Sequence, residues 1–139
     1  MPAQFSLRVT VRSYEVDFMG HVNHAVYHQY GEHARSQHLL AAGFSLHEQR
    51  VEHVGIVLLE SRIRYLRELT LGDDVEVTSD VEFGEGKTFR IEHMIMRGDT
   101  RCAEISCVLG LLDTEARRLL PEPKKRLMAL TPDPALLGG

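Results

Sequence analysis

Cysteine is scarce in this sequence, and long apolar runs are absent from it. The two cysteines, Cys102 and Cys107, would point to opposite faces of a shared strand because an odd number of positions separates them, so we predict no disulfide between them. Unpaired cysteines fit a reduced, cytoplasmic environment. Without a run of about 18 apolar residues, no membrane-spanning helix is predicted. Residues 1–4 also lack the basic segment and apolar core of a signal peptide.

Several catalytic signatures are absent as well. The sequence has no G-x-S-x-G motif, which argues against a serine triad, and no glycine pattern typical of phosphate or dinucleotide binding. The stretch nearest to an H-E-x-x-H zinc motif starts at His47 but has Val51 in place of the second histidine. His24 and His28 are four residues apart with His21 nearby, a spacing that can bind zinc. Because the rest of a zinc motif is lacking, we predict neither a metal nor a cofactor.

The bulk composition is that of an ordinary globular domain. The chain has 139 residues, of which 43% are hydrophobic and 26% charged, and its formal net charge is −4. This length accommodates one domain with its own core, and we predict no domain boundary within residues 1–139. The negative net charge gives no basic field that would favour binding to nucleic acid.

Residues 24–42 are predicted to form a long helix. One stripe of residues recurs there at spacings of three and four; it consists of Tyr27, Tyr30, Ala34, His38 and Ala41. Asn23 is a suitable N-cap, and Gly43 is a suitable C-terminal stop. The stripe is more polar than that of a core helix, so we expect one side of the helix to face a ligand or a subunit.

Strands are predicted on both sides of this helix. Residues 5–13 alternate between apolar and polar side chains. After a short helix or turn within 44–53, four more stretches alternate; they are 54–67, 74–83, 89–96 and 101–112. In the first of these, strict alternation places Ser61 on the same face as Leu59 and opposite Leu58.

The order of these elements predicts an α+β fold, in which an antiparallel sheet of about five strands wraps around one long central helix. One helix cannot cover both faces of such a sheet, so we expect a second subunit to bury the remaining surface, in a homodimer or a homotetramer. Residues 121–139 form a polar tail that contains prolines and a basic run, and we expect it to lie on the surface or to be partly disordered.

Four residues suited to catalysis lie directly before the predicted helix. Asp17, Gly20, His21 and Asn23 fall within seven positions. The N-terminus of a helix carries free N–H groups and the positive end of the helix dipole, which attract developing negative charge. This combination favours an active site at the start of the helix.

The same residues belong to a recognisable motif. Asp17-x-x-Gly20-His21-Val22-Asn23-His24-x-x-Tyr27, followed by Glu32-His33-Ala34-Arg35, resembles the hotdog-fold thioesterases of the 4-hydroxybenzoyl-CoA thioesterase-like branch. Ile63-x-Tyr65 and Leu71-Gly72-Asp73 extend the resemblance more loosely. It implies a hotdog fold and the hydrolysis of an acyl-CoA thioester to a free carboxylic acid and CoA, without a cofactor.

The resemblance also implies roles for individual residues. Asp17 would be the catalytic carboxylate, as nucleophile or general base, and His21 would assist it. Backbone N–H groups near Asn23 and His24 would hold the oxyanion. Substrate contacts are expected from the motif and from basic residues that would bind CoA phosphates; these are Gly20, His24, Tyr27, Glu32, Arg62, Arg64, Lys87 and Thr88. Plain structural roles remain open, such as a capping carboxylate for Asp17 and a solvated surface charge for Lys87.

The nature of the thioester is less closely indicated. The motif is also similar to the Asp-x-Asn-x-His-Val-Asn-Asn-x-x-Tyr pattern of acyl-carrier-protein thioesterases, but Met19 and His24 replace two of its asparagines. These departures favour acyl-CoA as the substrate, and the acyl group stays open. One alternative is a hotdog dehydratase or hydratase acting on 3-hydroxyacyl thioesters, with His21 facing Glu32 or Glu60. Another is a non-catalytic module that binds acyl thioesters.

Overall fold

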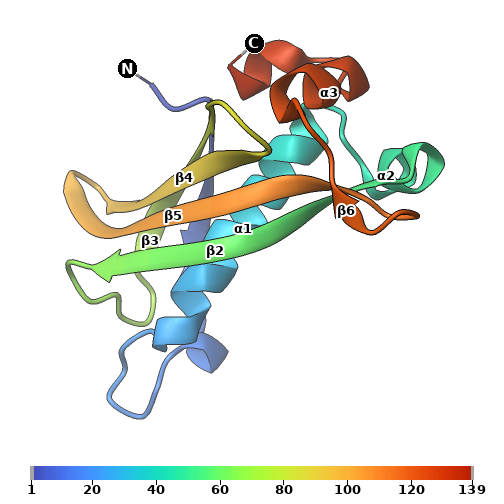
Figure 1. Ribbon diagram of the computed structural model, residues 1–139. Helices are drawn as coiled ribbons and strands as arrows, with labels where there is room; N and C mark the ends of the chain where they lie inside the picture. The colour runs from blue at the N-terminus through green and yellow to red at the C-terminus, as the bar shows by residue number, and fades with distance from the viewer. Residues whose placement is uncertain (1, 139) are drawn as a thin grey trace.

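The computed structural model describes residues 2–138, which form one curled sheet, one long helix and several short helices (Figure 1). The strands are β1 (Phe5–Thr10), β2 (Val54–Tyr65), β3 (Asp74–Phe83), β4 (Thr88–Arg97), β5 (Thr100–Asp113) and β6 (Arg118–Leu119). The α-helices are α1 (His24–Ala41), α2 (Leu46–Glu52) and α3 (Pro123–Leu130), and the 3-10 helices are η1 (Ser13–Glu15) and η2 (Pro134–Leu137).

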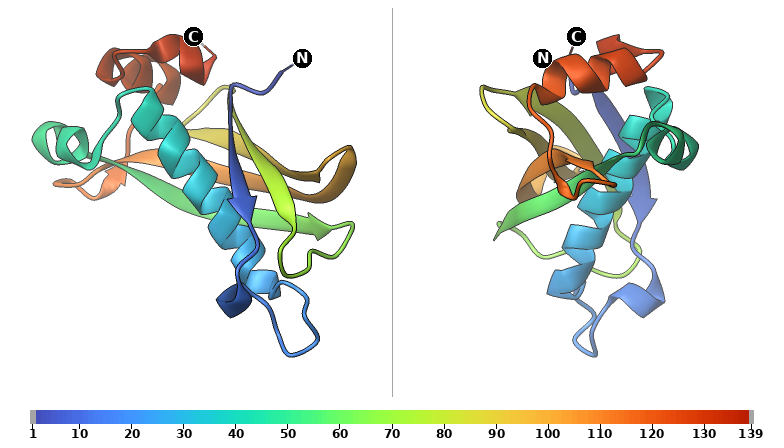
Figure 2. Two further views of the ribbon diagram at one scale, coloured as in Figure 1. Left: turned by 180° about the vertical axis from the view of Figure 1, so that it is seen from behind. Right: turned by 45° about the vertical axis from the view of Figure 1, so that its right-hand side comes forward.

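The sheet has the strand order β1-β3-β4-β5-β2, with every neighbouring pair antiparallel and with β6 paired to β5. It curls around α1, which runs along its concave face (Figure 2). Buried and less buried residues alternate along β3 and β4, so that Val77, Ile91 and Ile95 face the helix. The predicted α+β fold, an antiparallel sheet wrapped around a central helix, is therefore confirmed.

Helix α1 packs closely against the sheet. At Gly31 a Cβ atom would lie 3.1 Å from Cδ1 of Ile105 and 3.3 Å from a ring carbon of His93, so glycine lets the helix approach the sheet without displacing these side chains. Further along the helix, His38 is fully buried, and its Nδ1 lies 2.8 Å from Oγ of Ser79 on β3. These contacts fix the position of α1 across the sheet.

The predicted faces of β2 were wrong beyond Leu58. Leu59 is an extra residue, because the pairing with β5 shifts by one position between Leu58 and Glu60. Beyond this bulge, Ser61 lies opposite the buried Cys107 and faces α1, as Leu58 does before it. Strict alternation does not foresee a bulge, and one inserted residue moves every later side chain to the other face.

The two ends of the chain also differ from the prediction. β1 ends at Thr10 rather than at residue 13, and η1 follows it. The segment from residue 121 onward is folded: Leu127 of α3 and Leu137 of η2 are fully buried. Pro123 starts α3, since a proline at the first helical position loses no needed N–H. The buried apolar residues between the prolines hold this segment in place, although its average composition is polar. Gly139 lies outside the described residues.

Replacing Gly43 with alanine is expected to destabilise the fold more than the same change at Gly72. Both residues have positive φ angles, +98° and +85°, but a Cβ at Gly43 would lie 2.3 Å from Cδ of Pro132 while Gly72 has open space. Chemical denaturation should show that Gly43→Ala loses about 1–3 kcal/mol more free energy of unfolding than Gly72→Ala. Equal losses would contradict the close contact between the end of α1 and the C-terminal segment.

Candidate active site

A tight hairpin immediately precedes α1. Val16 and Val22 pair as an isolated antiparallel bridge, and the N–H of Asp17 donates to the C=O of His21 at 2.8 Å. The N–H of Gly20 donates back to the C=O of Asp17 at 2.9 Å. Gly20 has a φ of +82°, which glycine adopts without steric cost. The motif glycine therefore forms the turn that presents Asp17.

The two carboxylate oxygens of Asp17 have different surroundings. Oδ1 accepts the backbone N–H groups of Met19 at 2.9 Å and His21 at 3.2 Å. Oδ2 has no hydrogen-bond partner within residues 2–138, and the residue is exposed. Two backbone donors therefore hold the carboxylate in one orientation. The second oxygen is left available to accept a proton or to attack an electrophile.

Most N–H groups at the start of α1 already have acceptors. The Asn23 side chain accepts the N–H of Ala25 at 2.9 Å, which confirms the predicted N-cap. The N–H of Asn23 donates to the C=O of Glu15, and that of Val26 donates to the C=O of Asn23. Among the described residues, this leaves the N–H of His24 without an acceptor in the first turn. A developing oxyanion at this helix end would therefore meet His24 rather than Asn23.

The segment after β2 forms the opposite wall of the site. Nε2 of His21 lies 3.5 Å from a carboxylate oxygen of Glu68, and the N–H of Val22 donates to the C=O of Leu69 at 2.8 Å. The buried N–H of Leu69 donates to the hydroxyl of Tyr27 at 3.2 Å. Burial raises the pKa of the Tyr27 hydroxyl above its ordinary value, and this hydrogen bond offsets only part of the rise. These contacts hold the hairpin, α1 and the segment after β2 together.

A small cavity lies between this wall and the first turn of α1. The Tyr65 hydroxyl donates to the C=O of His24 at 3.1 Å, and its ring meets that of Tyr27 edge-on, with centroids 5.0 Å apart. The cavity has a volume of about 250 Å³, and its lining is Val22, His24, Tyr27, Tyr65, Leu66, Arg67 and Glu68. Two of the predicted substrate-binding residues, His24 and Tyr27, therefore share this cavity.

Polar contacts continue along the line where α1 faces β2. Nδ1 of His28 lies 3.0 Å from Oγ of Ser61, the residue that the bulge turns toward the helix. About two turns further along α1, Nη1 of Arg35 donates to Sγ of Cys107 at 3.8 Å. A second cavity of about 520 Å³ follows; its lining includes Glu32, Arg35, Leu39, Leu40, Phe44, Ile56, Leu58 and Leu109. Glu32 thus belongs to this second cavity and not to the hairpin.

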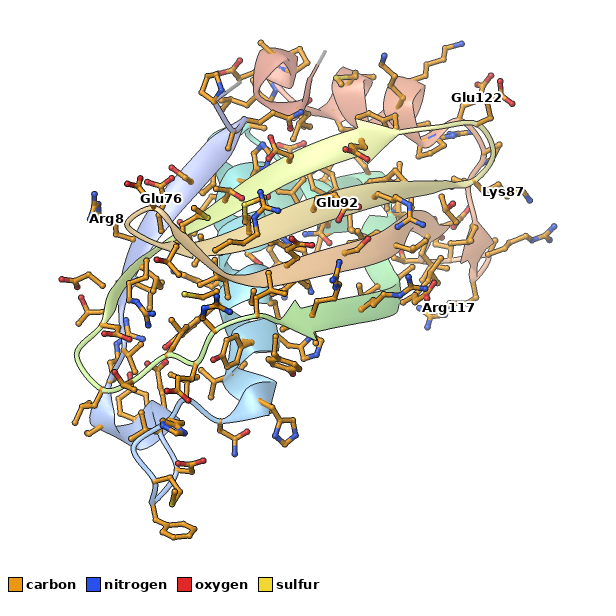
Figure 3. All side chains as sticks on the ribbon, turned by 90° about the vertical axis from the view of Figure 1, so that its left-hand side faces the viewer. Arg8, Glu76, Lys87, Glu92, Arg117 and Glu122 are labelled. Atoms are coloured by element: carbon orange, nitrogen blue, oxygen red, sulfur yellow. The ribbon has the colours of Figure 1, made fainter. Side chains whose placement is uncertain are left out.

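Four of the predicted phosphate-binding residues lie away from the hairpin. Arg62 and Arg64 follow the bulge on the outward face of β2, where Arg64 pairs with Glu104 at 3.8 Å. Lys87 lies in the turn before β4, at the end of the sheet beside α3, whereas the hairpin lies at the far end of α1 (Figure 3). Thr88 begins β4 directly after this turn. Within one chain, these residues and Asp17 are not brought together.

The profile of the thioesterase-like superfamily matches residues 11–130 of this sequence. The chain belongs to this superfamily. The predicted hotdog thioesterase family and the predicted thioester hydrolase are thereby confirmed.

Three similar proteins illustrate the family. A protein of Aquifex aeolicus strain VF5 is 31% identical over 100 residues, covering 72% of this chain and 78% of that protein. It is provisionally named an esterase. The chloroplastic acyl-acyl carrier protein thioesterase ATL3 of Arabidopsis thaliana is 28% identical over 91 residues, covering 66% of this chain and 48% of that protein. The structure of a thioesterase from Thermus thermophilus, complexed with coenzyme A and zinc, has a TM-score of 0.74 and 29% identity and covers 92% of this chain and 95% of that one.

Within residues 2–138, no group of three or more histidine, cysteine, aspartate or glutamate side chains is arranged to hold a metal ion. Over the same range, none of the helices has the length and apolar character that crossing a bilayer requires.

Sequence reasoning did not identify several residues of this site. Tyr65 was part of the resemblance but had no assigned role, and Glu68 stood out in no pattern. Glu15 and Tyr30 are joined by a hydrogen bond of 2.8 Å although they are distant in sequence. The unusual polarity of the helical stripe, to which Tyr30 belongs, was the one signal that pointed to such a contact.

Replacing Asn23 with alanine is expected to reduce the free energy of unfolding by about 0.5–2 kcal/mol, because the side-chain acceptor for the N–H of Ala25 is lost. Asn23→Ser keeps a short acceptor at the N-cap and should recover most of this loss. Urea denaturation of the three proteins measures both effects. An alanine variant as stable as the parent would contradict the capping role.

Proposed function

We propose that this chain hydrolyses an acyl-CoA thioester to the free carboxylic acid and CoA, with Asp17 as the catalytic carboxylate. The observation that carries the proposal is the free Oδ2 of Asp17 on a hairpin that leads directly into the open N–H of His24. Thioester hydrolysis needs an activated oxygen nucleophile and a donor for the carbonyl oxygen. These two groups supply both requirements.

The carboxylate can act in two ways. As a general base, Asp17 takes a proton from water while the water oxygen bonds to the carbonyl carbon, and the oxyanion rests on the N–H of His24. Collapse of this adduct breaks the C–S bond, and the CoA thiolate takes the proton from Asp17. As a nucleophile, Oδ2 displaces the thiolate to form an anhydride, which water then hydrolyses. In both routes His21, paired with Glu68, orients the water.

Coenzyme A is the carrier that we favour for the acyl group. The complex of the Thermus thermophilus relative with coenzyme A supports this choice. Arg67 lines the small cavity beside Tyr65 and is a cation of the same chain that can meet a phosphate there. Lys87 and Thr88 lie at the other end of the molecule, so they would reach the same CoA only from a second copy.

A homodimer through the edge of β2 completes the site. β2 is the last strand of the main sheet path, and Leu58, Leu59 and Tyr65 on it are about half exposed. A second copy paired antiparallel along this edge would continue the sheet and cover these side chains. Two-fold symmetry would also reverse the second α1, so that the later half of one helix lies near the start of the other.

The larger cavity is the proposed acyl pocket of this dimer. Its apolar wall includes Leu39 and Phe44, and Leu39 lies about four helical turns, or about 22 Å, beyond His24. An aromatic or short acyl group held by Asp17 would not reach this wall within its own chain. In the dimer the cavity would belong to the opposite copy, and the acyl group would lie between the two helices.

Replacing Asp17 with asparagine should abolish most of the activity without disturbing the fold. Asparagine keeps an oxygen that accepts the N–H groups of Met19 and His21, but it can neither take a proton nor attack. Thiol release from aromatic, short-chain, long-chain and 3-hydroxyacyl-CoA substrates should fall about a hundredfold or more for the substrates that the parent hydrolyses. Asp99→Asn, in the exposed turn before β5, is the matched control and should retain full activity.

The same assay separates the alternatives. An Asp17→Asn variant as active as the parent would contradict the catalytic role of Asp17. A change in the unsaturation of 3-hydroxyacyl-CoA without thiol release would identify a dehydratase or hydratase. Binding of acyl-CoA with neither reaction, detected as a raised melting temperature, would identify a binding module.

Replacing Leu59 with glutamate should break the dimer. Leu59 is 50% exposed at the bulge on the free edge of β2, and a charge buried there without a partner opposes association. Leu71 is 56% exposed in the turn before β3, and Leu71→Glu serves as the control. Light scattering should give about twice the chain mass for the parent and Leu71→Glu, and the chain mass for Leu59→Glu. A monomeric parent with full activity would contradict the shared site.

A further inference from the structure

A charged side chain is buried at the base of the Asp17 hairpin. Glu15 is only 7% exposed. Its Oε1 accepts the hydroxyl of Tyr30 at 2.8 Å and the backbone N–H of Arg12 at 2.8 Å, and its Oε2 lies 3.4 Å from Nη1 of Arg12. Burying a carboxylate is costly unless donors compensate it, and here three donors do so.

The backbone of Glu15 is tied to the start of α1. Its C=O accepts the N–H of Asn23 at 2.9 Å. The next pair along the hairpin is the bridge between Val16 and Val22, and the pair after that joins Asp17 to His21. Glu15 thus stands at the first rung of the ladder whose third rung carries Asp17.

Tyr30 connects Glu15 to the buried face of α1. It is buried on α1 nearly two turns after His24, where the helix packs against the sheet. Burial, followed by the hydrogen bond to Glu15, raises the pKa of the Tyr30 hydroxyl well above its ordinary range. The hydroxyl therefore stays protonated near neutral pH, where it can donate to Glu15.

We infer that Glu15 and Tyr30 are positioning residues that fix the Asp17 carboxylate relative to the N–H of His24. The hydrogen bond between the N–H of Asn23 and the C=O of Glu15 connects to both groups of the proposed site. Asp17 follows Glu15 by two residues, and His24 directly follows Asn23. The inference rests on the proposed function of Asp17. Since a displacement of about 1 Å at reacting groups can cost about a hundredfold in rate, loss of this anchor should lower kcat more than it changes KM.

The test compares two variants that each delete one buried hydroxyl in a hydrogen bond between α1 and a neighbouring segment. Tyr30→Phe removes the donor to Glu15, and Ser79→Ala removes the partner of His38 at the other end of the helix. Amide hydrogen exchange of Met19 and His21 reports the order of the hairpin whether or not the chain turns over a thioester. Thiol release gives kcat and KM, and thermal unfolding gives the loss of stability.

Tyr30→Phe should speed exchange at Met19 and His21 about fivefold or more and lower kcat about tenfold, with KM within about twofold. Ser79→Ala should lower the melting temperature about as much as Tyr30→Phe does, but it should leave hydrogen exchange in the hairpin and kcat unchanged. Glu15→Gln, which keeps an oxygen for Tyr30 and Arg12, should retain more activity than Glu15→Ala.

The outcomes distinguish this inference from the proposed function. Unchanged hairpin exchange in Tyr30→Phe, or equal effects of Ser79→Ala, would overturn the positioning role whatever the activity. Faster exchange in Tyr30→Phe alone, in a parent that hydrolyses no thioester, would uphold the anchor of the hairpin while the proposed function fails.

Discussion

The hydrogen bond from the N–H of Asn23 to the C=O of Glu15 joins the Asp17 hairpin to the first turn of α1. The same asparagine caps the helix through its side chain, so one residue ends the hairpin and starts the helix. Because of this double role, the dipole of α1 and the carboxylate of Asp17 share one rigid frame. This frame sets the positions of both the Asp17 carboxylate and the N–H of His24.

The sheet imposes the second constraint. Within residues 2–138, the curled sheet leaves the outer edge of β2 unpaired. Where α1 faces β2, the helix carries His28, Glu32 and Arg35 rather than an apolar stripe, and the bulge at Leu59 turns Ser61 toward it. A bulge commonly re-aims a side chain near a functional site. The line between α1 and the free edge of β2 is therefore where we propose that a ligand and a second copy meet.

Local features of the fold could be predicted from the sequence. The extent of α1, its cap at Asn23 and its stop at Gly43 depend on contacts between near neighbours, and the alternation along β3 and β4 depends on a period that a bulge does not interrupt there. These elements required only local geometry.

Other features depend on tertiary contacts that no local pattern encodes. The bulge in β2 arises from the register with β5. Glu68 meets His21 only after the segment following β2 has folded back onto the hairpin. The resemblance assigned Lys87 to the site of Asp17, but within a single chain Lys87 lies near the opposite end of α1. The C-terminal helix was missed because its buried leucines lie among prolines and lysines.

We propose that a thioester carbonyl binds at the N–H of His24, beside Asp17. This binding mode is tested most directly by nuclear magnetic resonance of the labelled parent protein, titrated with an acyl-CoA analogue in which a methylene group separates the carbonyl from sulfur. Such a ketone keeps the carbonyl oxygen but cannot be hydrolysed. The largest amide shift is expected at His24, with smaller shifts at Met19 and His21. Shifts confined to the turn around Lys87, with His24 unchanged, would contradict this binding mode.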